Sequence, residues 1–226
     1  MSGHCQELVA KADKDRYLSC LYAPAAKRPH LFALYAFNIE IARISQTVSE
    51  PQIGLVRQQW WLDTIEGIYA GATQDHPVAQ ALARAIEAAN LPKQPLGGLI
   101  IAHEFDLYDD PFPGLNDLEG YLGETSSALI QMASLVLGAS APDAAGLAGV
   151  ALGIAKMLHD HRMPKTTDLK AHARKRLAEA RSISIPPMAL PAFLPASLTE
   201  LYLDHPAPSQ FRRQLRLWWA ARNNRF

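Results

Sequence analysis

Apolar residues recur every three or four positions along most of this chain, which is the spacing of amphipathic helices. Residues 29–50 show the pattern clearly, because Pro29 suits the first turn of a helix and Pro51 marks the next boundary. Polar side chains interrupt the apolar ones within this helix. They either line a ligand cavity or are hydrogen-bonded groups inside a large helical core.

The other helices are predicted from the same period and from their end signals. Residues 52–70 form a second core helix, and we expect Ile53, Val56 and Trp60 to point into the core. Further helices are expected over residues 5–20, 77–90, 99–110, 115–138, 143–162, 166–182 and 211–226. No strand pattern of comparable strength occurs, so the sequence predicts an all-α protein.

Small residues and prolines mark two segments. Gly146, Gly149 and Gly153 would allow the helix over residues 143–162 to approach its neighbours closely, so we expect this helix to lie centrally. Several prolines interrupt residues 186–198, which are predicted to be an irregular connector.

The tail over residues 211–226 places apolar and aromatic side chains on neighbouring helical positions, with arginines around them. Two interpretations remain open. Trp218 and Trp219 either close the bundle or lie at a membrane interface, where Trp and Arg are favoured.

Composition limits the class of protein. With 226 residues and 49% hydrophobic residues, the chain can build one sizeable core, and we expect a single domain over residues 1–226. Lys plus Arg and Asp plus Glu number 22 each, so no overall positive charge favours nucleic acid as a partner. The two cysteines have no metal-binding spacing, and we expect a reducing, intracellular setting.

Common catalytic motifs are missing from the sequence, including a phosphate-binding glycine loop, HExxH and GxSxG. Acidic residues gather at Asp106, Asp109 and Asp110. For Asp109 and Asp110 the favoured interpretation is a solvated turn. His159, Asp160 and His161 are adjacent, and neighbouring side chains on a helix point about 100° apart, so they cannot chelate one metal together.

Several segments together resemble the squalene/phytoene synthase family. The opening LYAPAAKRPHLFALYAFNIEIARISQ is similar to the start of these enzymes, and DLEGYLGETSSAL and GVALGIAKMLHD follow in the family's order. The resemblance implies a single-domain antiparallel helical bundle of the isoprenoid synthase type around a central cavity. In active members that cavity holds two prenyl diphosphates and Mg²⁺.

The resemblance also shows where this chain departs from active members, which bind Mg²⁺ through two aspartate-rich motifs on facing helices. The acidic positions of the first motif fall on Ala42, Arg43 and Gln46. In the second motif Asp160 matches the leading aspartate, while later acidic positions fall on Met163 and Pro164. In prenyl transfer the diphosphate leaving group needs divalent cations to depart. The resemblance therefore implies that prenyl transfer is compromised in this chain.

A non-canonical branch of the family, which includes the mitochondrial complex I assembly factor and its α-proteobacterial relatives, shares these departures. The shared patterns are FNxExA at residues 37–42, VSE at 48–50, GETSSAL at 123–129 and PAFLP at 191–195. Compared with the family, the chain is shortened after Pro164.

The resemblance therefore implies a non-catalytic protein for membrane-associated assembly work, as in complex I biogenesis, or for isoprenoid or lipid binding. The alternative is an active prenyltransferase that uses relocated acids such as Asp63, Asp106 or Asp160. We expect no metal and no cofactor, with Mg²⁺ required only under that alternative. Asp160 is the remnant catalytic candidate, and the cavity-lining candidates are Tyr35, Asn38, Glu40, Arg43, Tyr121 and Glu124.

The expected partners are a membrane surface or a respiratory-complex subunit, and the expected ligand is an isoprenoid or lipid. No nucleic acid is expected. The expected location is the bacterial cytoplasm, peripheral to the inner membrane.

Overall fold

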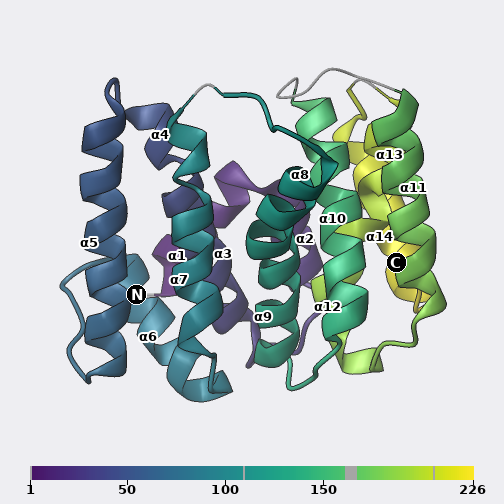
Figure 1. Ribbon diagram of the computed structural model, residues 1–226. Helices are drawn as coiled ribbons and strands as arrows, with labels where there is room; N and C mark the ends of the chain where they lie inside the picture. Colours follow the sequence, from purple (N-terminus) through teal and green to yellow (C-terminus); the bar gives the residue numbers. More distant parts are fainter. Residues whose placement is uncertain (1, 109, 161–166, 206) are drawn as a thin grey trace.

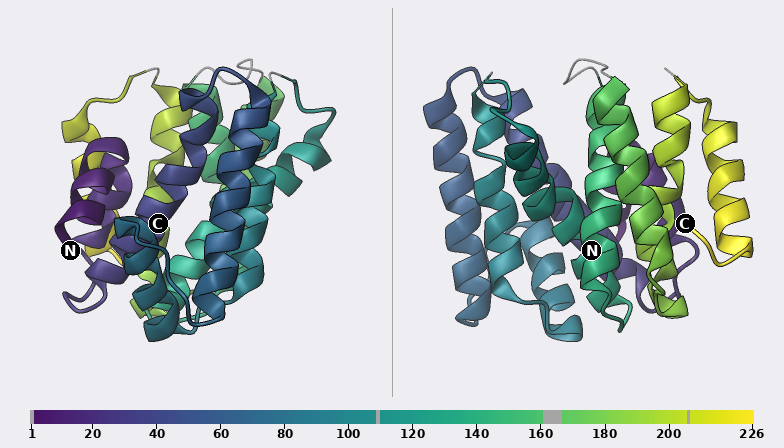
Figure 2. Two further views of the ribbon diagram at one scale, coloured as in Figure 1. Left: turned by 90° about the vertical axis from the view of Figure 1, so that its left-hand side faces the viewer. Right: turned by 45° about the vertical axis from the view of Figure 1, so that its right-hand side comes forward.

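The structure is a computed structural model that describes residues 2–108, 110–160, 167–205 and 207–226. The described residues contain helices and no strand, which confirms the all-α prediction. The longer helices stand side by side, with α5 at one edge and α11, α13 and α14 toward the other (Figure 1). Figure 2 shows the same row from two further directions.

The α-helices, in chain order, are α1 (Ser2–Ala12), α2 (Lys14–Cys20), α3 (Arg28–Ala42), α4 (Ile44–Thr47), α5 (Pro51–Tyr69), α6 (Pro77–Ala89), α7 (Lys93–Ala102), α8 (Leu115–Leu122), α9 (Ala128–Val136), α10 (Pro142–His159), α11 (Thr167–Ser182), α12 (Leu190–Phe193), α13 (Thr199–Asp204) and α14 (Gln210–Arg222). Short 3₁₀ turns cover Phe105–Leu107, Pro187–Ala189 and Leu194–Leu198, and a π-helical turn covers Gly123–Ser127.

The helix is interrupted at Asp13, so the prediction of one continuous helix over residues 5–20 was wrong. Asp13 has a non-helical backbone, with φ −138°, and its carboxylate accepts the backbone N–H of Arg16 at 3.1 Å. An aspartate followed by this bond is a helix N-cap, which starts α2 as a new helix. The helix expected over residues 29–50 likewise divides, into α3 and α4.

The inward face of α5 differs from the predicted one. Ile53 and Val56 are 45% and 70% exposed, whereas Gly54 and Trp61 are buried. Trp61 packs edge-to-face on Phe37, with ring centroids 5.4 Å apart. Apolar side chains recur at helical spacing on two neighbouring stripes of this helix, and only the contacts made by α5 decide which stripe is inside.

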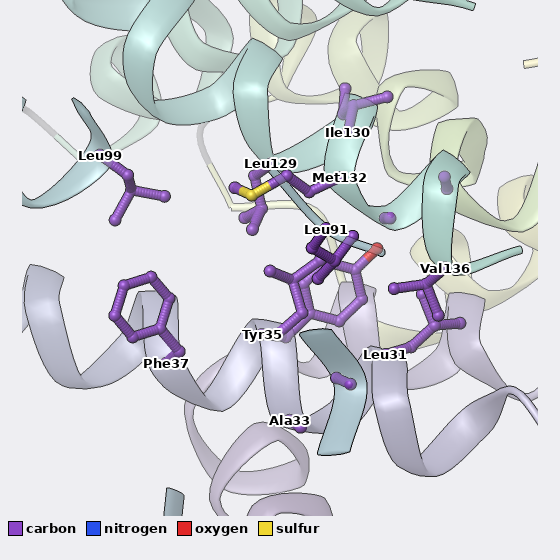
Figure 3. Packing of buried hydrophobic residues seen from close by; sticks show 14 of the residues in the cluster. Leu31, Ala33, Tyr35, Phe37, Leu91, Leu99, Leu129, Ile130, Met132 and Val136 are labelled. Atoms are coloured by element: carbon purple, nitrogen blue, oxygen red, sulfur yellow. The ribbon is translucent and has the colours of Figure 1, made fainter. Parts of the chain in front are cut away.

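The main core lies between α3 and α9. Figure 3 shows Leu31, Tyr35 and Phe37 on α3, with Met132 and Val136 across from them on α9. All five side chains are fully or almost fully buried. This packing fixes the helix that carries three of the predicted site residues, Tyr35, Asn38 and Glu40.

Residues 189–198 are part of the core, so the prediction of an irregular connector over residues 186–198 was wrong for most of its length. Pro191 and Pro195 lie within the first two positions of short helical turns, where a missing backbone N–H leaves no partner unpaired. Phe193 and Leu194 are fully buried. The prolines therefore start helical turns here and do not interrupt the packing.

Among the described residues, no helix combines the length and the apolar character that a membrane crossing requires.

Helix α10 packs closely against its neighbours, as its glycines predicted. A Cβ atom placed on Gly149 would lie 2.3 Å from Cα of Ser127, and one on Gly153 would lie 2.4 Å from Cδ2 of Leu122. A Cβ atom on Gly146 would meet nothing within 4 Å. The close approach thus depends on two of the three glycines.

We expect Gly149→Ala to destabilise the protein by roughly 1–3 kcal/mol, because the added methyl group meets backbone that cannot move aside easily. Gly146→Ala is the matched control, and it should be neutral or stabilising by up to about 1 kcal/mol through helix propensity. Urea denaturation followed by circular dichroism measures both. Equal stabilities for the two variants would contradict this account of the α10 packing.

Candidate functional site

A cluster of charged side chains lies inside the bundle, where α2 begins beside α10. The carboxylate of Asp13 accepts a second hydrogen bond from Nη1 of Arg16 at 2.7 Å. Nζ of Lys156, on α10, lies 3.4 Å from the same carboxylate. The side chains of Asp13 and Arg16 are each 10% exposed, and that of Lys156 is 30% exposed. One buried negative charge is therefore held between two positive ones.

The charges of this cluster support one another. Burial alone would raise the pKa of Asp13, but the positive charges of Lys156 and Arg16 and the hydrogen bonds from Arg16 outweigh it and hold the pKa well below its usual range. Burial opposes ionisation of Arg16 too, and Asp13 more than offsets this, so the pKa of Arg16 is raised. Asp13 and Arg16 therefore both stay charged at neutral pH.

Tyr35 is the predicted site residue that adjoins this cluster. The guanidinium of Arg16 lies over the Tyr35 ring, 5.6 Å from its centroid. Burial raises the pKa of the Tyr35 hydroxyl. Tyr35 thus separates the charged cluster from the apolar core seen in Figure 3.

A second polar network ties the same turn to the C-terminal part of the chain. The hydroxyl of Tyr202, on α13, donates to the carboxylate of Asp15, and Nη1 of Arg213, on α14, donates to it at 2.9 Å. Asp15 is 3% exposed. Burial, with Asp15 beside it, raises the pKa of Tyr202.

The positions that match the family's aspartate-rich motifs lie at the end of α3 and just after it, on α4, and directly after α10. Ala42 is half-buried at the end of α3, and Arg43 and Gln46 are exposed. Asp160 is exposed and follows directly after α10, four residues beyond Lys156. Met163, Pro164 and His161 lie outside the described residues.

This donor set does not fit a magnesium site. Mg²⁺ requires several oxygen ligands, usually including carboxylates, and of the motif positions described only Asp160 supplies one. Within the described ranges, no group of three or more His, Cys, Asp or Glu residues could hold a metal ion. The buried carboxylate of Asp13 is already paired with the cations Arg16 and Lys156.

The other cavity-lining candidates are separated in space. Glu40 and Arg43 line a surface hollow of about 360 Å³ between α3, α4 and α5, together with Arg57 and Trp60. Asn38 is half-buried on α3. The structure brings Glu40 and Arg43 together but not with Tyr35, which lies in the core.

Tyr121 and Glu124 lie near α7. The hydroxyl of Tyr121 donates to the carboxylate of Asp106 at 2.9 Å, and Nδ1 of His103 lies 2.7 Å from that carboxylate. Glu124 is exposed, and a Cβ atom on Gly98 would lie 2.5 Å from its Oε2. That the six candidates line a ligand cavity remains a prediction.

Sequence reasoning missed the charged cluster and the grouping of His103 with Asp106. One local signal was present in each case. Asp13 precedes Arg16 by three positions, which is the spacing of an N-cap and its partner. His103 precedes Asp106 by the same interval, which places both side chains on one side of a turn. No local signal could have revealed Lys156 as a partner of Asp13.

Comparison with solved structures defines the fold as that of the isoprenoid synthases. A crystal structure of a dehydrosqualene synthase in complex with ligand superposes with a TM-score of 0.79 at 16% identity, covering 99% of this chain and 96% of that one. The squalene synthase HpnC from Alicyclobacillus acidocaldarius superposes with a TM-score of 0.73 at 17% identity, covering 100% and 95%.

Sequence comparison shows the family. The family model for squalene/phytoene synthase matches residues 9–162, and the chain belongs to this family. It is 34% identical to "NADH dehydrogenase (ubiquinone) complex I, assembly factor 6" from Bos taurus over 239 residues, covering 88% of this chain and 72% of the relative.

Two further relatives match over shorter spans. The human protein of the same name is 38% identical over 158 residues, covering 69% of this chain and 47% of the relative. A 15-cis-phytoene synthase from Synechocystis is 29% identical over 168 residues, covering 68% and 49%. The chain thus spans about half the length of these two relatives.

We expect Asp13→Asn to lower the free energy of unfolding by roughly 3 kcal/mol at pH 7, because Arg16 and Lys156 lose their buried counter-charge. Asp63→Asn is the matched control on the exposed side of α5, where Asp63 accepts a hydrogen bond from Gln59, and it should change stability by less than about 0.5 kcal/mol. Urea denaturation measures both.

The loss of stability caused by Asp13→Asn should depend on pH. Because the pKa of Asp13 is lowered in the folded state, its contribution is complete above the unfolded value of about 3.9 and is lost as pH falls below it. The difference between the wild type and Asp13→Asn should therefore narrow in acid. A difference that stays constant between pH 7 and pH 3 would show that charge is not its cause.

Proposed function

We propose that this chain has lost prenyl-transfer chemistry and acts in the assembly of a respiratory complex of the complex I type, at a membrane surface. The observation that carries the proposal is the set of residues at the first aspartate-rich motif. Ala42, Arg43 and Gln46 stand where active members need carboxylates. Departure of a diphosphate needs divalent cations to stabilise the developing charge, and these side chains cannot hold them.

The interior charges support the same proposal. Active members use bound metal to balance carboxylates inside the bundle, whereas here Arg16 and Lys156 balance Asp13 directly. Such a cluster needs no metal to be stable, because each buried charge already has a partner of opposite sign. The synthase fold can therefore persist without the synthase reaction.

The relatives support the assembly role. The bovine and human relatives carry the name complex I assembly factor 6, and the chain matches 88% of its own length to the bovine protein. The phytoene synthase of Synechocystis is less similar and matches less of the chain. A respiratory-complex subunit is accordingly the proposed partner, and the cytoplasmic side of the bacterial inner membrane is the proposed location.

The prenyltransferase alternative has less support in the geometry. It requires relocated acids that act together, and the three candidates lie on different elements. Asp63 is on the exposed side of α5, and Asp106 already binds His103 and Tyr121. Asp160 is exposed after α10.

Purified protein supplied with Mg²⁺ and farnesyl or geranylgeranyl diphosphate should release no pyrophosphate above background. We expect a rate at least about a thousandfold below that of a phytoene synthase assayed in parallel, because the metal-bound stabilisation of the leaving group is lost. A coupled pyrophosphate assay measures this. Turnover that Asp160→Ala abolishes would overturn the proposal in favour of the alternative.

Deletion of the gene in its own organism should reduce assembled complex I severalfold, as seen by blue-native electrophoresis and NADH:quinone activity of membranes. The wild-type gene should restore assembly, and so should Asp160→Ala, because the proposed role needs no prenyl transfer. Normal complex I in the deletion strain would refute the assembly role. Restoration by the wild type but not by Asp160→Ala would refute the non-catalytic reading.

The isoprenoid or lipid ligand is a separate part of the proposal. Native mass spectrometry of the purified protein tests it, since a bound ligand adds a defined mass. A reproducibly unliganded protein would refute ligand binding, and only the assembly role would then remain proposed.

A further inference from the structure

The outer face of α14 carries a continuous apolar stripe. Phe211, Leu215 and Trp218 are 71%, 51% and 51% exposed, and their spacing of four and three residues aligns them along one side of the helix. The opposite side packs on the bundle through Leu217 and Ala220, which are buried. Of the two interpretations left open by the sequence, the exposure of Trp218 and Trp219, 51% and 47%, does not fit the one in which they close the bundle. Figure 2, in its right-hand view, shows α14 at the outer edge of the molecule.

The charged side chains of α14 and of the residues that flank it are all basic. Residues 205–226 contain five arginines and no acidic residue. Arg213 and Arg216 are paired, with Asp15 and with Glu200. Among the described residues, the guanidinium groups of Arg212, Arg222 and Arg225 have no hydrogen-bonded or ion-paired partner. Arg222 lies on the same side of the helix as the stripe, eleven residues after Phe211.

A pocket of about 460 Å³ opens beside the stripe. Trp219, Arg216 and Arg225 line it on the side of α14 and its tail, and Ile183 and Ile185 line it on the other side. Trp219 is 47% exposed, and the guanidinium of Arg216 lies 5.3 Å from its ring centroid. Apolar and cationic surface therefore continues from the stripe into this pocket.

This combination fits one kind of partner. Aromatic side chains and arginines on a helix that lies flat are the features of segments bound in the interface of a bilayer with anionic lipids. A second copy of the chain fits poorly, because a symmetric contact would bring unpaired arginines against one another with no acid on this segment to balance them.

We propose that α14 is a docking helix for membranes that contain anionic phospholipids. Phe211, Leu215 and Trp218 enter the boundary between headgroups and acyl chains. Arg212, Arg222 and Arg225 contact lipid phosphates at the level of the headgroups. The inference deepens the membrane location named in the proposed function, but it is argued from the surface of α14, and failed vesicle binding would not by itself refute the assembly role.

Flotation with vesicles tests the docking helix. We expect the full chain to bind vesicles of phosphatidylcholine and phosphatidylglycerol in a 7:3 ratio about tenfold or more tightly than vesicles of phosphatidylcholine alone. Binding should weaken in 0.5 M NaCl, because salt screens the contacts between arginine and phosphate. Absence of binding to the anionic vesicles, or equal binding to both kinds, would overturn the proposal.

Two matched double variants separate the stripe from general surface hydrophobicity. Phe211→Ser with Leu215→Ser should reduce binding to anionic vesicles about tenfold or more. Ile53→Ser with Val56→Ser removes similarly exposed side chains, 45% and 70%, from α5 at the other edge of the molecule, and should bind as the wild type does (Figure 1). Equal loss in both variants would contradict the assignment to α14.

A third variant tests the charges. Arg212→Gln with Arg222→Gln should remove most of the preference for anionic vesicles, since neither guanidinium group has a partner within the part of the chain that the structure describes. Circular dichroism melting should match the wild type in all variants, which excludes unfolding as the cause. If light scattering instead shows a dimer that only Phe211→Ser with Leu215→Ser dissolves, and vesicle binding is unchanged, the stripe is a self-association surface and the proposal fails.

Discussion

The carboxylate of Asp13, held between Arg16 and Lys156, is the interaction on which the arrangement of this bundle depends. It joins a break near the N-terminus to the central helix α10 across 143 positions of sequence. Asp15, two residues later, reaches Tyr202 and Arg213 near the other end of the chain. One turn of backbone is thereby fixed to both the centre and the C-terminal part, and each buried charge keeps a partner that compensates the cost of its desolvation.

The same interaction explains how a synthase fold can persist without the donor set of a synthase. A bundle with carboxylates facing its interior needs cations there, and bound metal is one way to supply them. Here the cations are side chains of the chain itself, from α2 and α10. The interior charges described here are balanced although Ala42, Arg43 and Gln46 stand where active members carry acidic residues.

The helices at the two edges of the bundle, α5 and α14, differ in the charges that accompany their exposed apolar side chains. Both α5 and α14 expose apolar stripes to solvent, yet only α14 combines its stripe with unpaired arginines and no acid. The surface of α5 includes Glu66, which pairs with Lys93, and Asp63. An exposed apolar stripe alone does not indicate a binding surface, since scattered apolar side chains are normal on protein surfaces. The charges around the stripe are what distinguish α14 from α5.

The sequence by itself determined that the chain is helical and determined most helix ends, because apolar period, proline and glycine act locally. It also determined that the family's metal-binding carboxylates are missing, since Ala42, Arg43 and Gln46 can be read directly from the listing of residues. These features depend on neighbours in the chain.

Only the tertiary structure decided which stripe of α5 is buried, because Trp60 and Trp61 both satisfy a helical period and the contact of Trp61 with Phe37 selects one. It also decided that Pro191 and Pro195 start buried turns. The pairing of Asp13 with Lys156 was also decided only by the tertiary structure, since two residues separated by 143 positions leave no pattern in either segment. Local periodicity fixes helices, whereas long-range contacts choose their faces and balance their charges.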